Sequence, residues 1–198
     1  MINFTQFDMF FGLTVLAILL VILRRRGRGF SYLFFFSVFW IYLLYVVSVI
    51  LFPFPIFGDQ TNVAFKPRIN LIPFYFGSCE MLNLCIRDIV GNILLTIPFG
   101  FGISFITRIK AKDFVALAFA VGLTFECAQL LMSFVFKIAF RTIDINDVLL
   151  NATGVLIGYG FFKIFSTAYL KIRQGLNMKG EGMFAYVEEV ARHSSQAT

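Results

Sequence analysis

The stretch RTIDINDVLLNATGVLIG, residues 141–158, runs from charged and amide side chains directly into an apolar segment. Within it, Asp144, Asp147, Asn151, Gly154 and Gly158 follow one another at spacings of 3, 4, 3 and 4, which places them on one face of a helix. Polar groups at membrane depth are costly and normally point into the protein or a water-filled cavity. The stretch therefore predicts a membrane-spanning helix whose polar face is a candidate functional site.

The composition of the whole chain assigns it to the polytopic membrane proteins. Of its 198 residues, 59% are hydrophobic and only 14% are charged, and the mean hydropathy is +0.85. A hydrocarbon core about 30 Å thick needs roughly 20 apolar residues per helix. We therefore predict an all-α bundle of about five transmembrane helices. The segments that qualify are about 4–23, 30–52, 89–107, 113–136 and 147–170.

Basic residues in the short loops predict the orientation. Cytoplasmic loops carry an excess of Lys and Arg, so both basic loops are expected inside the cell. The N-terminus then lies outside and the C-terminus inside. Residues 1–170 form a single membrane domain in this interpretation, and 171–198 form a polar cytoplasmic tail that we expect to be mobile and dispensable for chemistry. The basic residues of the two loops are Arg24, Arg25, Arg26, Arg28, Arg108, Lys110 and Lys112.

A second apolar segment, NLIPFYF at 70–76, is too short to span the membrane and is interrupted by Pro73. We expect it to lie in the membrane interface or to re-enter the bilayer. Re-entrant backbone is tolerated only where protein or a water-filled cavity covers it. A re-entrant segment would therefore imply a recess on the outer face.

Polar residues on the outer halves of three predicted spans form the candidate ligand-binding site. Glu126 would lie about 15 Å below the outer end of its span at Phe136, so we expect it to be protonated or paired. The candidate residues are Arg87, Asp88, Asn92, Glu126, Gln129, Arg141, Asp144, Asp147 and Asn151.

Each candidate also has a purely structural interpretation. Asp88, Asp144 and Asp147 are placed to cap helices, where carboxylates accept backbone N–H bonds. Gln129 and Asn151 are of the type that forms hydrogen bonds between membrane helices, worth roughly 0.6 kcal/mol each. We favour a site because so many polar side chains occur together on three spans.

Other chemistries have weaker support. Free thiols are the default for Cys79, Cys85 and Cys127, and a bond between Cys79 and Cys85 requires an oxidising compartment. The only histidine, His193, lies in the tail, so we predict neither a His-ligated metal nor a Ser-His-Asp triad. We expect no cofactor and no nucleic-acid partner. A carboxylate-bound Mg²⁺ or Ca²⁺ is the less favoured alternative, on Asp88, Glu126, Asp144 and Asp147.

Four motifs in the chain resemble the VanZ-like family of bacterial membrane proteins. They are NLIPF at 70–74, RDIVGNILLTIPFG at 87–100, Glu126-x-x-Gln129, and RTIDINDVLLNATG at 141–154, and the resemblance covers about 70–165. It implies a link to glycopeptide resistance, notably to teicoplanin. Thr96 departs from the bulkier apolar residue usual at its position, which we interpret as inconsequential. The matching positions are Asn70, Pro73, Asn92, Pro98, Gly100, Glu126, Gln129, Arg141, Asp144, Asp147, Asn151 and Gly154.

Two functions remain open on this basis. The first is a non-enzymatic protein of the cell envelope that binds a lipid, a lipid-linked cell-wall precursor or a lipoglycopeptide in an outward-facing recess. Arg87 and Arg141 would hold a phosphate or carboxylate there, and Glu126 would anchor the polar network. The alternative is an intramembrane hydrolase or transferase that acts on a lipid head group with Glu126 as general acid or base. A transporter ranks third, because no repeat symmetry is visible.

Overall fold

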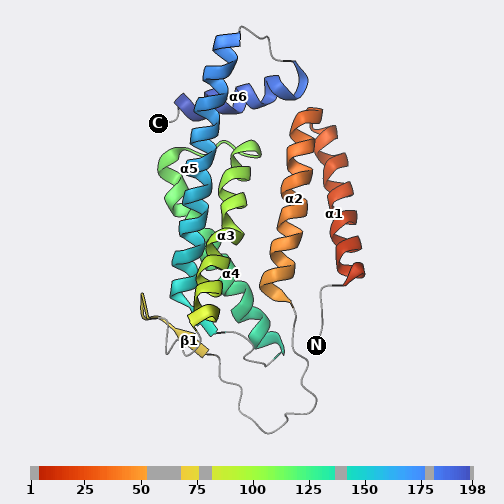
Figure 1. Cartoon of the computed structure of the whole chain (residues 1–198). Coiled ribbons are helices and arrows are strands. Elements are labelled where there is room, and N and C mark those ends of the chain that lie inside the picture. The colour runs from red at the N-terminus through yellow and green to blue at the C-terminus, as the bar shows by residue number, and fades with distance from the viewer. Residues whose placement is uncertain (1–4, 53–67, 76–81, 137–141, 177–180, 197–198) are drawn as a thin grey trace.

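The computed structural model describes residues 5–52, 68–75, 82–136, 142–176 and 181–196. Five of its helices are long and apolar enough to cross a membrane, which confirms the predicted all-α bundle (Figure 1). The third span runs from Cys85 through the end of α3 and the short helix η1 to Phe105. The helices are α1 Gln6–Arg25, α2 Phe30–Leu51, α3 Leu82–Gly102, η1 Ile103–Phe105, α4 Ala111–Phe136, α5 Ile145–Leu176 and α6 Gly182–Gln196.

Helix α5 is the centre of the bundle, and it packs closely against α3 through glycines. A Cβ atom added at Gly100, Gly154 or Gly158 would lie closer than 3.0 Å to backbone atoms of the facing helix. Small residues at such positions let two membrane helices approach closely enough for extensive van der Waals contact. The glycines of the sequence motifs therefore set the α3–α5 distance.

Hydrogen bonds tie the other helices to this pair. Trp40 Nε1 of α2 donates to the Gly12 carbonyl of α1 at 3.0 Å, and Tyr42 Oη donates to the Leu95 carbonyl of α3 at 2.6 Å. Helix α4 packs its buried Phe114 on Tyr159 of α5, with ring centroids 3.8 Å apart. Helices α1 and α2 stand beside the α3–α4–α5 core as an antiparallel hairpin (Figure 1).

A two-stranded parallel sheet, which the sequence did not predict, lies beside the start of α5. Strand β1 spans Arg68–Asn70 and strand β2 spans Thr142–Asp144, with Asn70 opposite Asp144. The segment expected to be interfacial or re-entrant is thus a strand followed by a turn, as far as residue 75, and residue 76 lies outside the described residues. Phe74 in the turn is 80% exposed.

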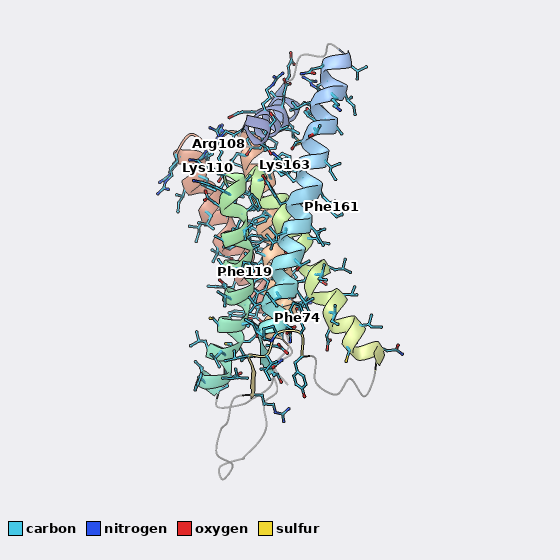
Figure 2. All side chains as sticks on the ribbon, turned by 90° about the vertical axis from the view of Figure 1, so that its left-hand side faces the viewer. Phe74, Arg108, Lys110, Phe119, Phe161 and Lys163 are labelled. Atoms are coloured by element: carbon cyan, nitrogen blue, oxygen red, sulfur yellow. The ribbon has the colours of Figure 1, made fainter. Side chains whose placement is uncertain are left out.

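The two ends of the bundle differ in character (Figure 2). Phe74 and the strands lie at one end, which we call the recess end, and Arg108, Lys110 and Lys163 lie toward the other, the basic end. Between the ends, Phe119 and Phe161 are exposed on the outer surface of the bundle. Such apolar side chains suit contact with lipid tails.

The described part of the C-terminal tail is helical and packed against the bundle, where we expected a mobile segment. Helix α5 continues to Leu176, and α6 then returns across the basic end, where its Ala191 is only 1% exposed (Figure 1). Tyr186 Oη donates to the Phe105 carbonyl, and Lys163 Nζ donates to the Ser194 carbonyl at 2.6 Å. The docking of α6 could not be predicted from the sequence, because the apolar residues of this helix contact the bundle and not one another.

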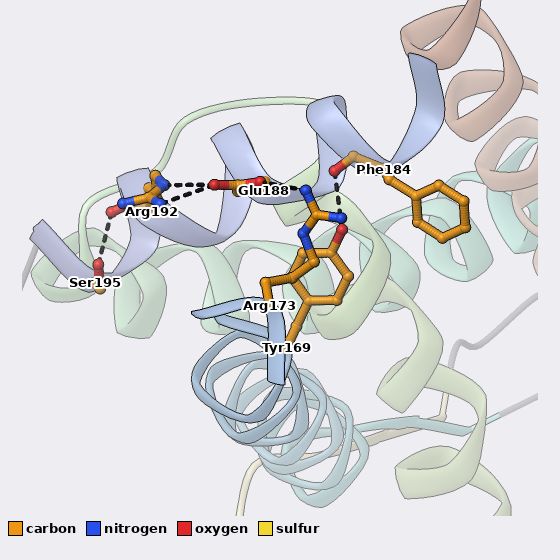
Figure 3. Close-up of polar contacts among 6 residues, drawn as sticks. All are labelled: Tyr169, Arg173, Phe184, Glu188, Arg192 and Ser195. Atoms are coloured by element: carbon orange, nitrogen blue, oxygen red, sulfur yellow. Dashed lines mark hydrogen bonds and ion pairs between the residues drawn. The ribbon is translucent and has the colours of Figure 1, made fainter. Parts of the chain in front are cut away.

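An ion-pair network also holds α6 to the end of α5 (Figure 3). Glu188 accepts from Arg173 of α5 at 3.1 Å and from Arg192 of α6 at 2.8 Å, while Tyr169 Oη donates to the Phe184 carbonyl at 2.9 Å. The hydrogen bonds from Arg192 and then Arg173 hold the pKa of Glu188 below its ordinary value of 4.5.

This network predicts a pH dependence for the docking of α6. A carboxylate whose pKa is lowered by folding stabilises the folded state above pH 4.5, and that contribution is lost as the pH falls through the lowered pKa. We expect Glu188→Gln to speed hydrogen exchange of the α6 amides at pH 7, and this difference from the wild type to shrink as the pH falls from 4.5 through the lowered pKa. The exposed Glu181→Gln is the control, and equal exchange in both variants at pH 7 would contradict the docking role.

Candidate functional site

A cavity of about 640 Å³ opens at the recess end among α2, α3, α4 and α5. Eight of the nine predicted ligand-binding residues line it, and the ninth, Arg141, lies outside the described residues. Val49, Ile50 and Phe125 add apolar walls. The eight polar residues come from α3, α4 and the β2–α5 segment: Arg87, Asp88, Asn92, Glu126, Gln129, Asp144, Asp147 and Asn151.

Glu126 holds the start of the fifth helix deep beside α4. Its Oε2 atom accepts a hydrogen bond from the backbone N–H of Asp144 at 2.9 Å, and its side chain is only 4% exposed. Because Glu126 precedes the last residue of α4, Phe136, by ten residues, this contact lies about 15 Å along α4 from its end. The β2–α5 junction therefore forms the floor of the recess.

Asp144 is the helix cap that the structural interpretation anticipated, and it also joins the strands. Its Oδ1 atom accepts from the backbone N–H of Asn146 at 2.8 Å, the usual bond from an N-cap to the second helical residue. The side-chain amide of Asn70 donates to both carboxylate oxygens at 3.0 Å. Asp144 thus links the family-like NLIPF segment to the first turn of α5.

Asp147 has a different role, because it connects two helices across the recess. Its Oδ1 atom accepts a hydrogen bond from Asn92 Nδ2 of α3 at 2.8 Å. Asp147 is half-buried in the first turn of α5, where the positive end of the helix dipole favours a carboxylate. The part of the polar stripe that lies within α5 therefore faces α3, where Asp147 and Asn151 accept hydrogen bonds from Asn92 and Thr96.

Asn146 is a structural residue of the site that sequence reasoning missed. It is 2% exposed, accepts from the backbone N–H of Phe74 at 2.6 Å, and donates to the Tyr75 carbonyl at 2.9 Å. These bonds hold the turn in which Phe74 adopts a left-handed φ of 61°. In the sequence, the only indication of this role was that Asn146 is a further polar residue between Asp144 and Asp147. Its position lies off the helical stripe that those two residues define.

Asn151 lies at the base of the recess with unused hydrogen-bonding capacity. It is 2% exposed, and among the described residues its Oδ1 atom has no hydrogen-bond partner. Its backbone carbonyl accepts from Thr96 Oγ1 at 2.8 Å, so Thr96 is not the inconsequential departure that we expected. Gln129 is also buried, at 6% exposure, and lines the same cavity. A buried amide oxygen without a partner carries a free-energy penalty that a bound donor would relieve.

Acidic side chains outnumber basic ones in the described lining of the recess. Its described lining contains four carboxylates and a single guanidinium, that of Arg87. Arg87 and Asp88 are exposed at the start of α3. Within the described ranges, no three His, Cys, Asp or Glu side chains are grouped so as to hold a metal ion, so the four carboxylates considered for Mg²⁺ or Ca²⁺ do not form such a group.

The cysteines correct another expectation. Cys85, which lines the recess, is disulfide-bonded, so the default of a free thiol is wrong for this residue. Cys127 on α4 is free and exposed, and Cys79 lies outside the described residues. Structural disulfides persist in oxidising compartments.

The five spans and the polar recess define a multi-pass α-helical membrane protein with a ligand-sized cavity at one end. The model of the VanZ/LLP1 family matches residues 39–166, and the chain belongs to this family. The match begins within α2, further toward the N-terminus than the four sequence motifs. Comparisons with curated proteins and with solved structures found no match.

Proposed function

We propose that the recess binds an amphiphile at the outer face of the bacterial cell membrane and thereby contributes to glycopeptide resistance, notably to teicoplanin. The amphiphile is a membrane lipid, a lipid-linked cell-wall precursor or a lipoglycopeptide. The observation that carries this proposal is the convergence of eight polar side chains with apolar walls in one cavity of about 640 Å³. Ligand pockets combine apolar walls with a few convergent polar groups in this way.

The balance of acidic and basic side chains in the described lining bears on which chemical group of the ligand would lie at the base of the recess. The carboxylates of the described lining outnumber its guanidinium four to one, while Arg141, the second arginine that we expected to hold a phosphate or carboxylate, lies outside the described residues. Carboxylates and a buried amide oxygen accept hydrogen bonds. An ammonium, amide or hydroxyl group of the ligand therefore suits the base of the recess better than a phosphate does.

The contacts of Glu126 support an anchoring role over a catalytic one. Its carboxylate accepts a backbone N–H of the β2–α5 junction, which fixes the geometry of the recess floor. A general acid or base must reach a substrate proton with the atom that transfers it. We therefore favour binding over the intramembrane hydrolase or transferase.

Lipids retained by the purified protein test the proposal directly. We expect mass spectrometry to find one enriched head-group class on the wild type and its loss from Asn151→Leu, which keeps the size of the side chain but removes the amide. The control is Thr153→Val on the exposed face of the same helix. Equal, unselective retention by all three proteins would refute ligand binding in the recess.

Glu126→Gln is expected to impair glycopeptide resistance without preventing membrane insertion. A glutamine side chain can still accept the hydrogen bond from Asp144, whereas the negative charge is lost. Antibiotic susceptibility and the amount of protein in the membrane are the two measurements. Full resistance at normal expression would show that the function requires neither the negative charge of Glu126 nor acid–base catalysis by its carboxyl group.

The orientation is tested by labelling with a membrane-impermeant thiol reagent in a Cys127→Ser background. We expect Leu71→Cys at the recess end to react in intact cells and Lys110→Cys at the basic end to resist. The basic loops support this orientation, and so does the disulfide at Cys85. The reverse labelling pattern would place the recess in the cytoplasm and refute its proposed role at the outer face.

A further inference from the structure

A second cavity, of about 830 Å³, lies at the basic end and is independent of the recess. Besides Tyr159 and Phe162 of α5, three segments distant in sequence line it. These are the α1–α2 connection at Gly27–Gly29, the segment from Ser104 to Ile109, and α6. The packing of α6 across the basic end therefore creates this cavity, because the helix supplies one of its walls.

Two arginines from the two basic loops meet at this cavity. Arg108 forms an ion pair with Glu189 of α6, which compensates its charge. The Arg28 guanidinium lies over the Tyr32 ring, 4.7 Å from its centroid, and the described residues place no carboxylate in an ion pair with it. Among the described residues of the lining, Glu189 is the only acidic one, so a positive charge remains there.

This arrangement differs from that of arginines that only bias membrane orientation. Such arginines need no defined contacts, whereas Arg28 is held by an aromatic ring at the wall of a cavity. The pKa of Tyr186, in the same wall, is raised to about 12, chiefly by desolvation, and Arg28 and Arg108 act in the opposite direction. The Tyr186 hydroxyl is thus partly desolvated, whereas Arg28 and Arg108 beside it are exposed to solvent.

Hydroxyl groups and an apolar floor complete the cavity. Ser194 Oγ is buried and has no hydrogen-bond partner among the described residues. Ser31, Ser104 and Thr107 also line the space. Phe105 and Phe162, which are 5% and 2% exposed, form its apolar floor. A guanidinium with several hydroxyl donors is the donor set that recognises phosphate oxygens.

We propose that this cavity binds a phosphoester anion, with Arg28 as its charged contact and Ser194 as a hydrogen-bond donor. The same chemistry is offered by a phospholipid head group of the adjacent leaflet and by a soluble phosphate compound. Basic pockets between helices at the membrane surface bind anionic head groups in this way. The proposal does not depend on the function of the recess.

The test measures binding of three probes to the full-length protein in detergent: short-chain phosphatidylglycerol, the diacylglycerol with the same chains, and inorganic phosphate. We expect phosphatidylglycerol to bind and Arg28→Gln to weaken its binding by about tenfold or more, as loss of a charge-assisted hydrogen bond predicts. Ser194→Ala should weaken it by about threefold. Arg25→Gln removes a neighbouring arginine that does not line the cavity, and it should leave binding unchanged.

The outcomes separate the two sources of phosphate and decide the proposal. Binding of phosphatidylglycerol alone identifies a lipid head group, and competition by inorganic phosphate at similar concentrations identifies a soluble phosphate compound. Equal binding of diacylglycerol would overturn the proposal, because the phosphate would then contribute nothing. Equal effects of Arg28→Gln and Arg25→Gln would overturn it as well, and Ser194→Ala provides the same decision if Arg28→Gln does not fold.

Discussion

Gly158→Ala is expected to prevent the chain from accumulating as a stable, monodisperse protein. An added Cβ would lie closer than 3.0 Å to the Ile97 carbonyl oxygen and to the backbone nitrogen of Phe101, so α3 and α5 would have to move apart. Overpacking a core commonly destabilises by about 1–3 kcal/mol, and a clash with backbone atoms on a facing helix lies at or above the upper end of that range. The amount of protein in the membrane and its monodispersity after extraction into detergent measure the effect, and thermal unfolding measures it for any protein that is recovered.

Gly160→Ala provides a closely matched control. It lies on the same helix two residues further on, and an added Cβ there would meet nothing within 4 Å. Because alanine favours helices over glycine, this variant should be as stable as the wild type or slightly more stable. Equal stability of Gly158→Ala and Gly160→Ala would show that α3 and α5 do not depend on the close approach seen in the structure.

The helices could be predicted from sequence because a span needs little more than an apolar run of sufficient length. The predicted 30–52 corresponds to Phe30–Leu51, and 113–136 corresponds to Ala111–Phe136. The fifth span was cut short at 170, because its last turns are polar and belong to the docking of α6. The parallel strands were missed because Asn70 and Asp144 lie 74 residues apart, and no local pattern reports such a pairing.

The convergence of the polar residues could be predicted from one physical constraint, namely that lipid cannot solvate polar side chains. That constraint placed Asn92, Glu126 and Asp147 on inward-facing sides of three helices, and the structure brings them to one cavity. It could not reveal their partners. The bond from the Asp144 backbone to Glu126 and the part played by Asn146 depend on how the β2–α5 junction enters the bundle, which is a property of tertiary packing.

Asp147→Asn is expected to abolish the proposed contribution to glycopeptide resistance while leaving the protein folded in the membrane. An asparagine Oδ1 atom can still accept the hydrogen bond from Asn92 Nδ2, so the link between α3 and α5 persists. The negative charge at the base of the recess disappears, and a hydrogen bond to a charged group is worth about 1.5–3 kcal/mol. Growth in teicoplanin, measured beside the amount of protein in the membrane, should match that of cells that lack the protein.

Asp144→Asn separates this role from helix capping. The structure makes Asp144 the cap of α5, and asparagine caps about as well as aspartate. The start of α5 should therefore survive, while the asparagine amide group would oppose the donor group of Asn70 and weaken the tie to β1. We expect partial resistance in Asp144→Asn and none in Asp147→Asn. Full resistance in Asp147→Asn would mean that the recess does not depend on its negative charge, and the preference for an amine, amide or hydroxyl group in the ligand would lose its basis.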